Sequence, residues 1–179
     1  MTTSTQDAQW VLRAQCRDRE ALEQLLRAVQ PSLQRYLVRL VGTQTADDLL
    51  QDVFITICRK LAWLRDPKLF RPWMFRIASR AAFRYLKRTR RRLEDPIDDT
   101  VMEWAVVPDV RLPEGGDLRQ LLGNDKLSPP SRAVLVLHFE EEMTLAAIAA
   151  VLEIPLGTVK SRLASGLATL RKQLQKGRP

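Results

Sequence analysis

Histidine and cysteine are scarce in this sequence, which holds only His138, Cys16 and Cys58 among its 179 residues. A structural zinc site needs about four such side chains close together, so this composition excludes one. Two isolated thiols also cannot form the disulfide framework of a small secreted domain. We therefore expect no metal and no cofactor, and we predict that both cysteines are buried free thiols in a reducing cytosol.

Long apolar runs are also missing. The longest, residues 145–152, falls well short of the ~18 residues that a membrane span requires, so we expect no membrane insertion. The polar first residues, MTTSTQDAQW, lack the charged start and the apolar core of an export signal. The expected location is therefore cytoplasmic.

The sequence contains no Gly-rich phosphate loop and no nucleophile–base signature, so we do not expect an enzyme. It also lacks the period-two alternation of strands and any internal repeat. Apolar residues, which make up 45% of the chain, recur at helical spacing instead. We predict an all-α fold of two small helical domains, an N-terminal helical bundle and a C-terminal helix-turn-helix domain.

Positive charge is plentiful but unevenly spread. The formal net charge is +8; residues 1–93 carry +11, residues 94–127 carry −6 and residues 128–179 carry +3. This uneven pattern favours a polyanionic partner over a chain that is merely basic. Residues 94–127 also contain several prolines and no sustained periodicity. We therefore predict domains at residues 1–93 and 128–179 that are joined by a flexible acidic linker.

Apolar spacing and breaker residues predict the elements of the first domain. Pro31 should interrupt the helix that begins near Gln9, because proline lacks an N–H and clashes with the preceding turn. Thr45 should cap a following helix. Residues 65–72, which contain two prolines, should form a loop, and a long helix should follow over residues 73–92.

The long helix has two faces. Its inward face is predicted to hold Phe75, Ala78, Ala82 and Tyr85. The other face carries a basic stripe, which consists of Arg76, Arg80, Arg84, Lys87, Arg88 and Arg91. Like charges at this spacing repel one another, so the stripe does not stabilise an isolated helix. Aromatic residues lie among the cations, and this combination suits the binding of unpaired nucleic-acid strands.

Residues 145–171, LAAIAAVLEIPLGTVKSRLASGLATLR, predict two helices joined by a short turn. Ser128 and two following prolines mark the start of a preceding helix, and Thr144 should cap the first helix of the pair. Val159 and Leu163 should face inward on the second helix. The residues left for a DNA major groove are Thr158, Lys160, Ser161, Arg162 and Ser165.

Two other functions stay open on these observations. Asp47, Asp48 and Asp52 form a close acidic set, in which Asp48 and Asp52 lie one turn apart and could share a magnesium ion. A nucleic-acid enzyme is therefore one alternative, although acids near a helix start also match the helix dipole. A stand-alone helix-turn-helix repressor or activator is the other, and it accounts for residues 128–179 only.

Three segments occur in an order that is typical of one protein family. They are ADDLLQDVF at residues 46–54, FRPWMFRIASRAAFRYLKR at residues 70–88, and residues 127–171. Together they resemble the extracytoplasmic-function group of bacterial sigma factors, in the sigma-70 family. The resemblance covers nearly the whole chain except the linker and the first residues. It implies a two-domain initiation factor that binds core RNA polymerase and directs it to promoters.

The resemblance also implies roles for single residues. Docking on the clamp helices of the largest polymerase subunit would involve Asp47, Asp48, Leu49, Gln51, Asp52 and Phe54. Opening and holding the melted minus-ten strand would involve Lys68, Leu69, Phe70, Trp73, Arg76, Arg80, Arg84, Lys87 and Arg88. The helix-turn-helix would read the double-stranded minus-thirty-five element through Thr158, Lys160, Ser161, Arg162 and Ser165, and would contact the polymerase flap. Many members are held inactive by an anti-sigma factor, so such a partner is expected.

Two residues depart from the family pattern. Arg80 stands where Asn is common in the minus-ten helix, so the base contact expected of that Asn is not carried over to this chain. Glu153 stands in a turn where Gly is common. If the turn needs a positive φ, the glutamate costs about 1 kcal/mol relative to glycine.

Overall fold

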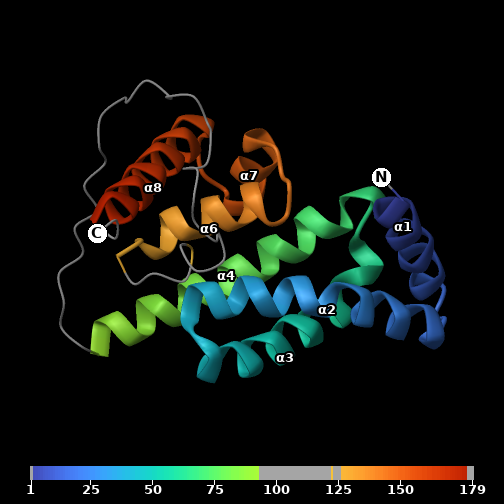
Figure 1. Ribbon diagram of the computed structural model, residues 1–179. Coiled ribbons are helices and arrows are strands. Elements are labelled where there is room, and N and C mark those ends of the chain that lie inside the picture. The colour runs from blue at the N-terminus through green and yellow to red at the C-terminus, as the bar shows by residue number, and fades with distance from the viewer. Residues whose placement is uncertain (1, 93–121, 123–125, 177–179) are drawn as a thin grey trace. The chain divides into compact units, whose positions relative to one another are not determined.

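The computed structural model describes residues 2–92, 122 and 126–176, and every regular element among them is helical (Figure 1). This confirms the predicted all-α fold. The chain divides into two compact units, residues 1–93 (unit 1) and residues 94–179 (unit 2). Most of the predicted linker, residues 94–127, lies outside the described residues.

Unit 1 is a bundle of four helices with two short 3-10 turns. The helices are α1 (Thr2–Gln15), α2 (Arg19–Val41), α3 (Thr43–Lys60) and α4 (Phe70–Arg92), and the turns are η1 (Leu61–Trp63) and η2 (Pro67–Leu69). In Figure 1, α2 lies among the other helices, and it packs against α1, α3 and α4. The buried residues of α2 recur every three or four positions, as one face of a helix requires: Ala21, Leu25, Val29, Leu33, Tyr36, Leu37 and Leu40.

The first helix break lies at residues 16–18 and not at Pro31, where it was predicted. Arg17 has a left-handed backbone with φ 66°, and Asp18 caps α2 by accepting a hydrogen bond from the Ala21 N–H at 3.0 Å. The helix then continues through Pro31, which is exposed, while apolar residues before and after it stay buried on one face. Burial of that face outweighs the one hydrogen bond that proline removes.

The predicted cap at Thr45 is also wrong. The N-cap lies three residues earlier, at Gly42, whose φ of 83° suits glycine, and α3 begins at Thr43. The Thr45 hydroxyl instead donates to the phenol oxygen of Tyr85 at 3.2 Å. A local capping signal was therefore replaced by a contact between α3 and α4 that sequence spacing does not encode.

The loop predicted at residues 65–72 is shorter than expected. Asp66 caps η2 by accepting from the Lys68 N–H at 3.0 Å, and α4 already begins at Phe70. Pro72 consequently lies in the first turn of α4, where the missing N–H of proline has no helical partner to lose. The proline is therefore accommodated inside the first turn and does not delay the start of α4.

A buried hydrogen-bond chain, together with apolar packing, anchors the inner face of α4. Phe75, Ala78 and Ala82 are fully buried, as predicted. Ser79 Oγ donates to the Phe75 carbonyl oxygen at 2.7 Å and lies 2.7 Å from the Tyr36 phenol oxygen. Because a hydroxyl has one proton, the Tyr36 O–H must donate to Ser79. Burial raises the pKa of the Tyr36 phenol far above its usual range, so the phenol stays a neutral donor.

The direction of donation along these hydrogen bonds predicts which of two substitutions lowers the stability of unit 1 more. Ser79→Ala should lower the free energy of unfolding of unit 1 by ~1–3 kcal/mol, because it leaves the buried Tyr36 O–H without an acceptor. Tyr36→Phe should cost only ~1 kcal/mol, because Ser79 keeps its bond to Phe75. Urea unfolding followed by tryptophan fluorescence measures both. A larger loss for Tyr36→Phe than for Ser79→Ala would contradict the assigned direction of donation.

Unit 2 contains α6 (Pro129–Phe139), α7 (Leu145–Leu152) and α8 (Leu156–Lys176). Ser128 caps α6 as predicted, with its Oγ accepting from the Ser131 N–H at 3.4 Å and prolines in the first turn. α6 packs against α7 and α8 and buries every residue from 133 to 137. Gly166 allows α8 to approach α6 closely, because a Cβ there would lie 2.7 Å from Leu135 Cδ1.

α7 and α8 form the predicted helix-turn-helix. Thr144 caps α7 by accepting from the Ala147 N–H at 3.2 Å, which confirms the predicted cap. Glu153 ends α7 in the left-handed conformation, with φ 56° and ψ 44°, and its N–H donates to the Ala149 carbonyl. The turn therefore needs a positive φ at a position where glycine is free of the Cβ strain that a glutamate meets.

Glu153→Gly should stabilise the helix-turn-helix by about 1 kcal/mol, because it removes that strain. Hydrogen exchange of the α7 and α8 amides should slow correspondingly. Glu153→Ala is the matched control, since alanine removes the same carboxylate but keeps the Cβ. If glycine and alanine change the exchange rates equally, side-chain contacts of Glu153 decide the stability of the turn and its backbone strain does not.

Both cysteines are free thiols, as predicted, but they are exposed and not buried. Cys16 lies in the break between α1 and α2, and Cys58 lies near the end of α3, where partial desolvation raises the pKa of its thiol. The general preference of cysteine for burial does not hold at either position. No helix within the described ranges is long and apolar enough to cross a membrane.

Candidate nucleic-acid interface

The basic stripe lies on the outer face of α4. Its members are Arg76, Arg80, Arg84, Lys87, Arg88 and Arg91, and all except the half-buried Arg76 are exposed. Helical spacing places the stripe opposite the buried face that Phe75 and Ala82 form. Trp73, which is half-buried, stands one turn before Arg76 on the same side. Cations with an aromatic ring at one end can hold phosphates and stack a base.

The aromatic residues near the stripe differ in burial, which separates their roles. Phe70 is only 1% exposed, and its ring centroid lies 6.1 Å from that of Trp73. Phe70 therefore supports Trp73 and offers no face to a base in this conformation, unlike the direct minus-ten contact predicted for it. Phe83 is half-buried, and Tyr85 faces inward to its bond with Thr45.

The acids of α3 divide into two kinds. Asp47 accepts a hydrogen bond from the side-chain amide of Gln34 on α2, which ties it to the bundle. Asp48, Gln51 and Asp52 are exposed, and their spacing of three and four residues places them on one outward side. The other two predicted residues of this segment, Leu49 and Phe54, are half-buried. An acidic side with apolar neighbours of this kind can dock a basic protein surface.

A cleft between α3 and α4 brings two predicted sites together. Leu49 and Asp52 line it from α3, and part of the basic stripe lines it from α4. The cations of its lining are Arg59, Lys60, Arg80, Arg84 and Arg88. Asp52 is the one acid among the described residues that line this cleft. The electrostatic potential of the cleft is therefore positive and favours the binding of an anion.

Two side chains of α1 hold the segment before α4, and no motif in the sequence marked either of them. Asp7, which is 2% exposed, forms an ion pair with Arg71 in the first turn of α4, with Oδ2 and Nε 2.6 Å apart. Gln15 Nε2 donates to the carbonyl oxygens of Leu61 at 2.9 Å and Leu64 at 2.8 Å. α1 therefore fixes both ends of the segment that contains η1 and η2.

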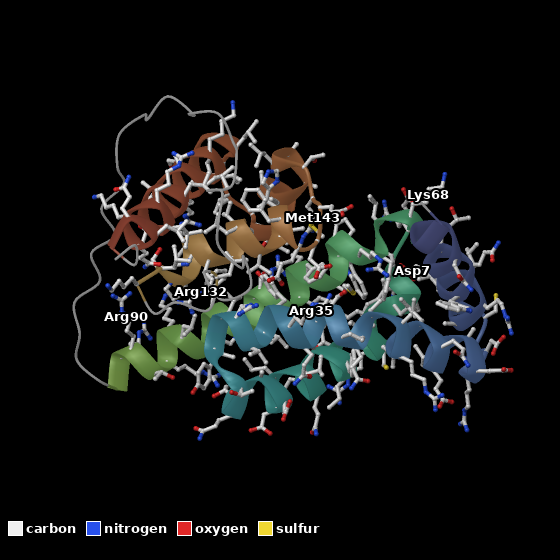
Figure 2. The ribbon with its side chains drawn as sticks, viewed as in Figure 1. Asp7, Arg35, Lys68, Arg90, Arg132 and Met143 are labelled. Carbon is white, nitrogen blue, oxygen red and sulfur yellow. The ribbon has the colours of Figure 1, made fainter. Side chains whose placement is uncertain are left out.

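The η2 turn displays two of the predicted site residues. Lys68 and Leu69 are exposed, Leu69 to 54%. Figure 2 shows Lys68 at the η2 turn and Asp7 on α1, the helix against which that turn packs. The part-buried ion pair of Asp7 with Arg71 thus joins α1 to the start of α4, directly after the turn that displays Lys68.

The outward side of α8 carries most of the residues predicted to face a major groove. Thr158, Ser161, Arg162 and Ser165 share one side at spacings of three and four residues, while Lys160 is exposed away from that line. Ser161 Oγ donates to the Thr158 carbonyl at 3.0 Å, which fixes the serine rotamer. On the opposite side, Val159 and Leu163 are fully buried, as predicted.

Metal chemistry finds little support in the part of the chain that the structure describes. No three His, Cys, Asp or Glu side chains there gather in a way that could hold a metal ion. Asp47, the third acid of the predicted set, is already engaged by Gln34. Among the described residues, only the pair Asp48 and Asp52 remains of the acidic set that suggested magnesium.

Comparison with known protein families covers both units. Residues 25–92 match sigma-70 region 2, and residues 125–172 match sigma-70 region 4. The chain is 31% identical to the RNA polymerase sigma-H factor of Pseudomonas aeruginosa, over 98% of this chain and 97% of that protein. The chain belongs to the sigma-70 family. Relatives of the extracytoplasmic-function group, described next, confirm the resemblance to that group.

Further relatives agree with this membership. The sigma factor is 28% identical to the extracytoplasmic-function factor SigW of Bacillus subtilis, covering 88% of this chain and 91% of that protein. It is 27% identical to the sigma-E factor of Escherichia coli, covering 91% of each. As a sigma factor it directs RNA polymerase to promoters. A stand-alone repressor or activator is not favoured, because region 2 accounts for unit 1.

Two solved structures share the fold. CnrH, in complex with the cytosolic domain of CnrY, aligns with a TM-score of 0.68 at 24% identity, over 97% of this chain and 99% of that one. RpoE of Bartonella quintana, in complex with the anti-sigma factor NepR, aligns with a TM-score of 0.67 at 23% identity, over 87% and 98%.

Proposed function

We propose that the two units of this sigma factor divide the promoter between them. Unit 1 binds core RNA polymerase through the exposed side of α3 and holds the melted minus-ten strand along α4 and η2. Unit 2 reads the double-stranded minus-thirty-five element through α8. The observation that carries this proposal is the cleft in which the Asp52 side of α3 borders the basic stripe of α4.

The proximity of these two surfaces supports a coupling between polymerase docking and strand binding. Like charges along the stripe repel one another, and a phosphate backbone relieves that repulsion while releasing its own counterions. Trp73 at the start of the stripe supplies an aromatic face for an unpaired base. Polymerase docked on α3 would lie beside the same strand, so the strand gains contacts from both proteins.

The proposed task of α8 rests on its side-chain chemistry. Ser and Thr hydroxyls suit either base edges or phosphates, and an arginine can donate two hydrogen bonds to guanine. Thr158, Ser161 and Ser165 are short side chains that allow the helix to approach a groove closely. Gly157, in the first turn, has open space around it and adds no bulk at that end.

We also propose that the factor works in the cytoplasm, as a binding protein without chemistry of its own, and that an anti-sigma factor controls it. Among the structures that share its fold, one is of CnrH in complex with the cytosolic domain of CnrY, and another is of the sigma factor RpoE in complex with the anti-sigma factor NepR. The exposed acidic side of α3 and the basic stripe are the surfaces that such a partner would have to cover.

Asp52→Ala should weaken binding to core polymerase about tenfold, or ~1.4 kcal/mol, because it removes a charge from the proposed docking side. Fluorescence anisotropy of labelled sigma factor titrated with core polymerase measures this affinity. Glu23→Ala is the matched control, since Glu23 is an exposed acid on α2. Equal affinities for the wild type and Asp52→Ala, with unchanged circular dichroism spectra, would remove Asp52 from the docking surface.

The division between units is tested with two DNA probes and the holoenzyme. Arg84→Ala should weaken binding to a single-stranded minus-ten oligonucleotide and reduce its salt slope by about 0.7 for one lost phosphate contact. Arg162→Ala should instead weaken binding to a duplex minus-thirty-five probe, by ~1–3 kcal/mol if Arg162 reads a base. Arg27→Ala, an exposed cation of α2, should affect neither probe. The proposal fails if Arg84→Ala and Arg162→Ala weaken binding to the same probe.

A further inference from the structure

Trp63 is the most exposed large apolar side chain among the described residues, with 75% of its surface accessible. It is the last residue of η1, a turn whose first residue, Leu61, is buried. The Leu64 N–H donates to the Leu61 carbonyl at 3.1 Å and closes the turn around Trp63. The backbone thus lies on the core while the indole faces solvent.

The turn under Trp63 is held from outside as well. The two N–H groups of the Gln15 amide donate to the carbonyl oxygens of Leu61 and Leu64, the residues that bracket Trp63. This clamp joins η1 to α1, which packs against it. An indole has two rotatable bonds, so a ring displayed on a fixed backbone loses little conformational freedom when it binds a partner.

The charged residues near Trp63 in sequence indicate which class of molecule its ring could bind. Four cations close to Trp63 in sequence are exposed: Arg59 and Lys60 at the end of α3, Arg65 after η1, and Lys68 in η2. The nearest acid in sequence, Asp66, uses its carboxylate to accept from the Lys68 N–H and cap η2. The segment is therefore positive and carries an accessible aromatic face. Rings among cations are the combination that binds unpaired nucleotides, through base stacking and phosphate contacts.

We propose that Trp63 is a stacking face for an unpaired base of promoter DNA, additional to Trp73. This inference rests on the proposed function, because it extends the strand-binding surface of α4 and η2 to the η1 turn. The exposed Leu69 of η2 provides apolar surface in the same segment. Gln15 acts as a positioning residue, which keeps the turn fixed while the indole contacts the base.

The test uses holoenzyme and a fluorescent oligonucleotide of the non-template strand from a promoter that the wild-type factor transcribes. Trp63→Ala should weaken binding of this single strand by about 5- to 150-fold, the range for one base–aromatic stack. Trp63→Phe and Trp63→Tyr should retain most of the affinity, because both keep a ring. The salt slope should stay at the wild-type value, since no phosphate contact is lost.

Leu12→Ala, which shortens another exposed apolar side chain of unit 1, is the control and should leave the affinity unchanged. Core-polymerase affinity and duplex minus-thirty-five binding are measured for each variant. Unchanged single-strand affinity in Trp63→Ala overturns the inference, and so does a loss confined to core polymerase, which would make Trp63 a protein contact. If the wild-type holoenzyme itself fails to bind the strand, the proposed function fails instead.

Discussion

The structure of unit 1 depends on the burial of one side of α4. Phe75, Ala78 and Ala82 pack into the bundle, and the Tyr36–Ser79–Phe75 hydrogen-bond chain fixes how α4 is rotated against α2. With that side fixed, helical periodicity leaves only the opposite side for the six cations of the stripe. Their mutual repulsion is a cost that the packed side offsets, and a bound phosphate backbone removes it.

The segment before α4, which contains η1 and η2, is also held in place by contacts with a neighbouring helix. α1 places a buried carboxylate, Asp7, against Arg71 and clamps the η1 turn with Gln15. The ion pair is costly to bury, so its retention is consistent with fixing a geometry, which here is the start of the strand-binding surface. The two turns therefore stay fixed although each displays exposed side chains, Trp63 in η1 and Lys68 and Leu69 in η2.

The sequence was informative where signals are local or periodic, and misleading where a distant contact decides. The caps at Ser128 and Thr144, the inward pair Val159 and Leu163, and the two faces of α4 were predicted because each depends on neighbours within one or two turns. The cap predicted at Thr45 was wrong because the Thr45 hydroxyl donates its hydrogen bond to Tyr85, 40 residues away. The roles of Asp7 and Gln15 could not be predicted for the same reason, since their partners lie 46 to 64 residues away.

The central claim is that α4 contacts the melted strand and α8 contacts the duplex upstream of it. Site-specific photocrosslinking in the open complex tests this most directly, with a photoreactive residue introduced at Arg84 in one protein and at Ser165 in another. The account predicts that position 84 crosslinks to the non-template strand at the minus-ten element and position 165 to duplex DNA at the minus-thirty-five element. Crosslinks from both positions to the same element, or from position 84 to duplex DNA alone, would contradict it.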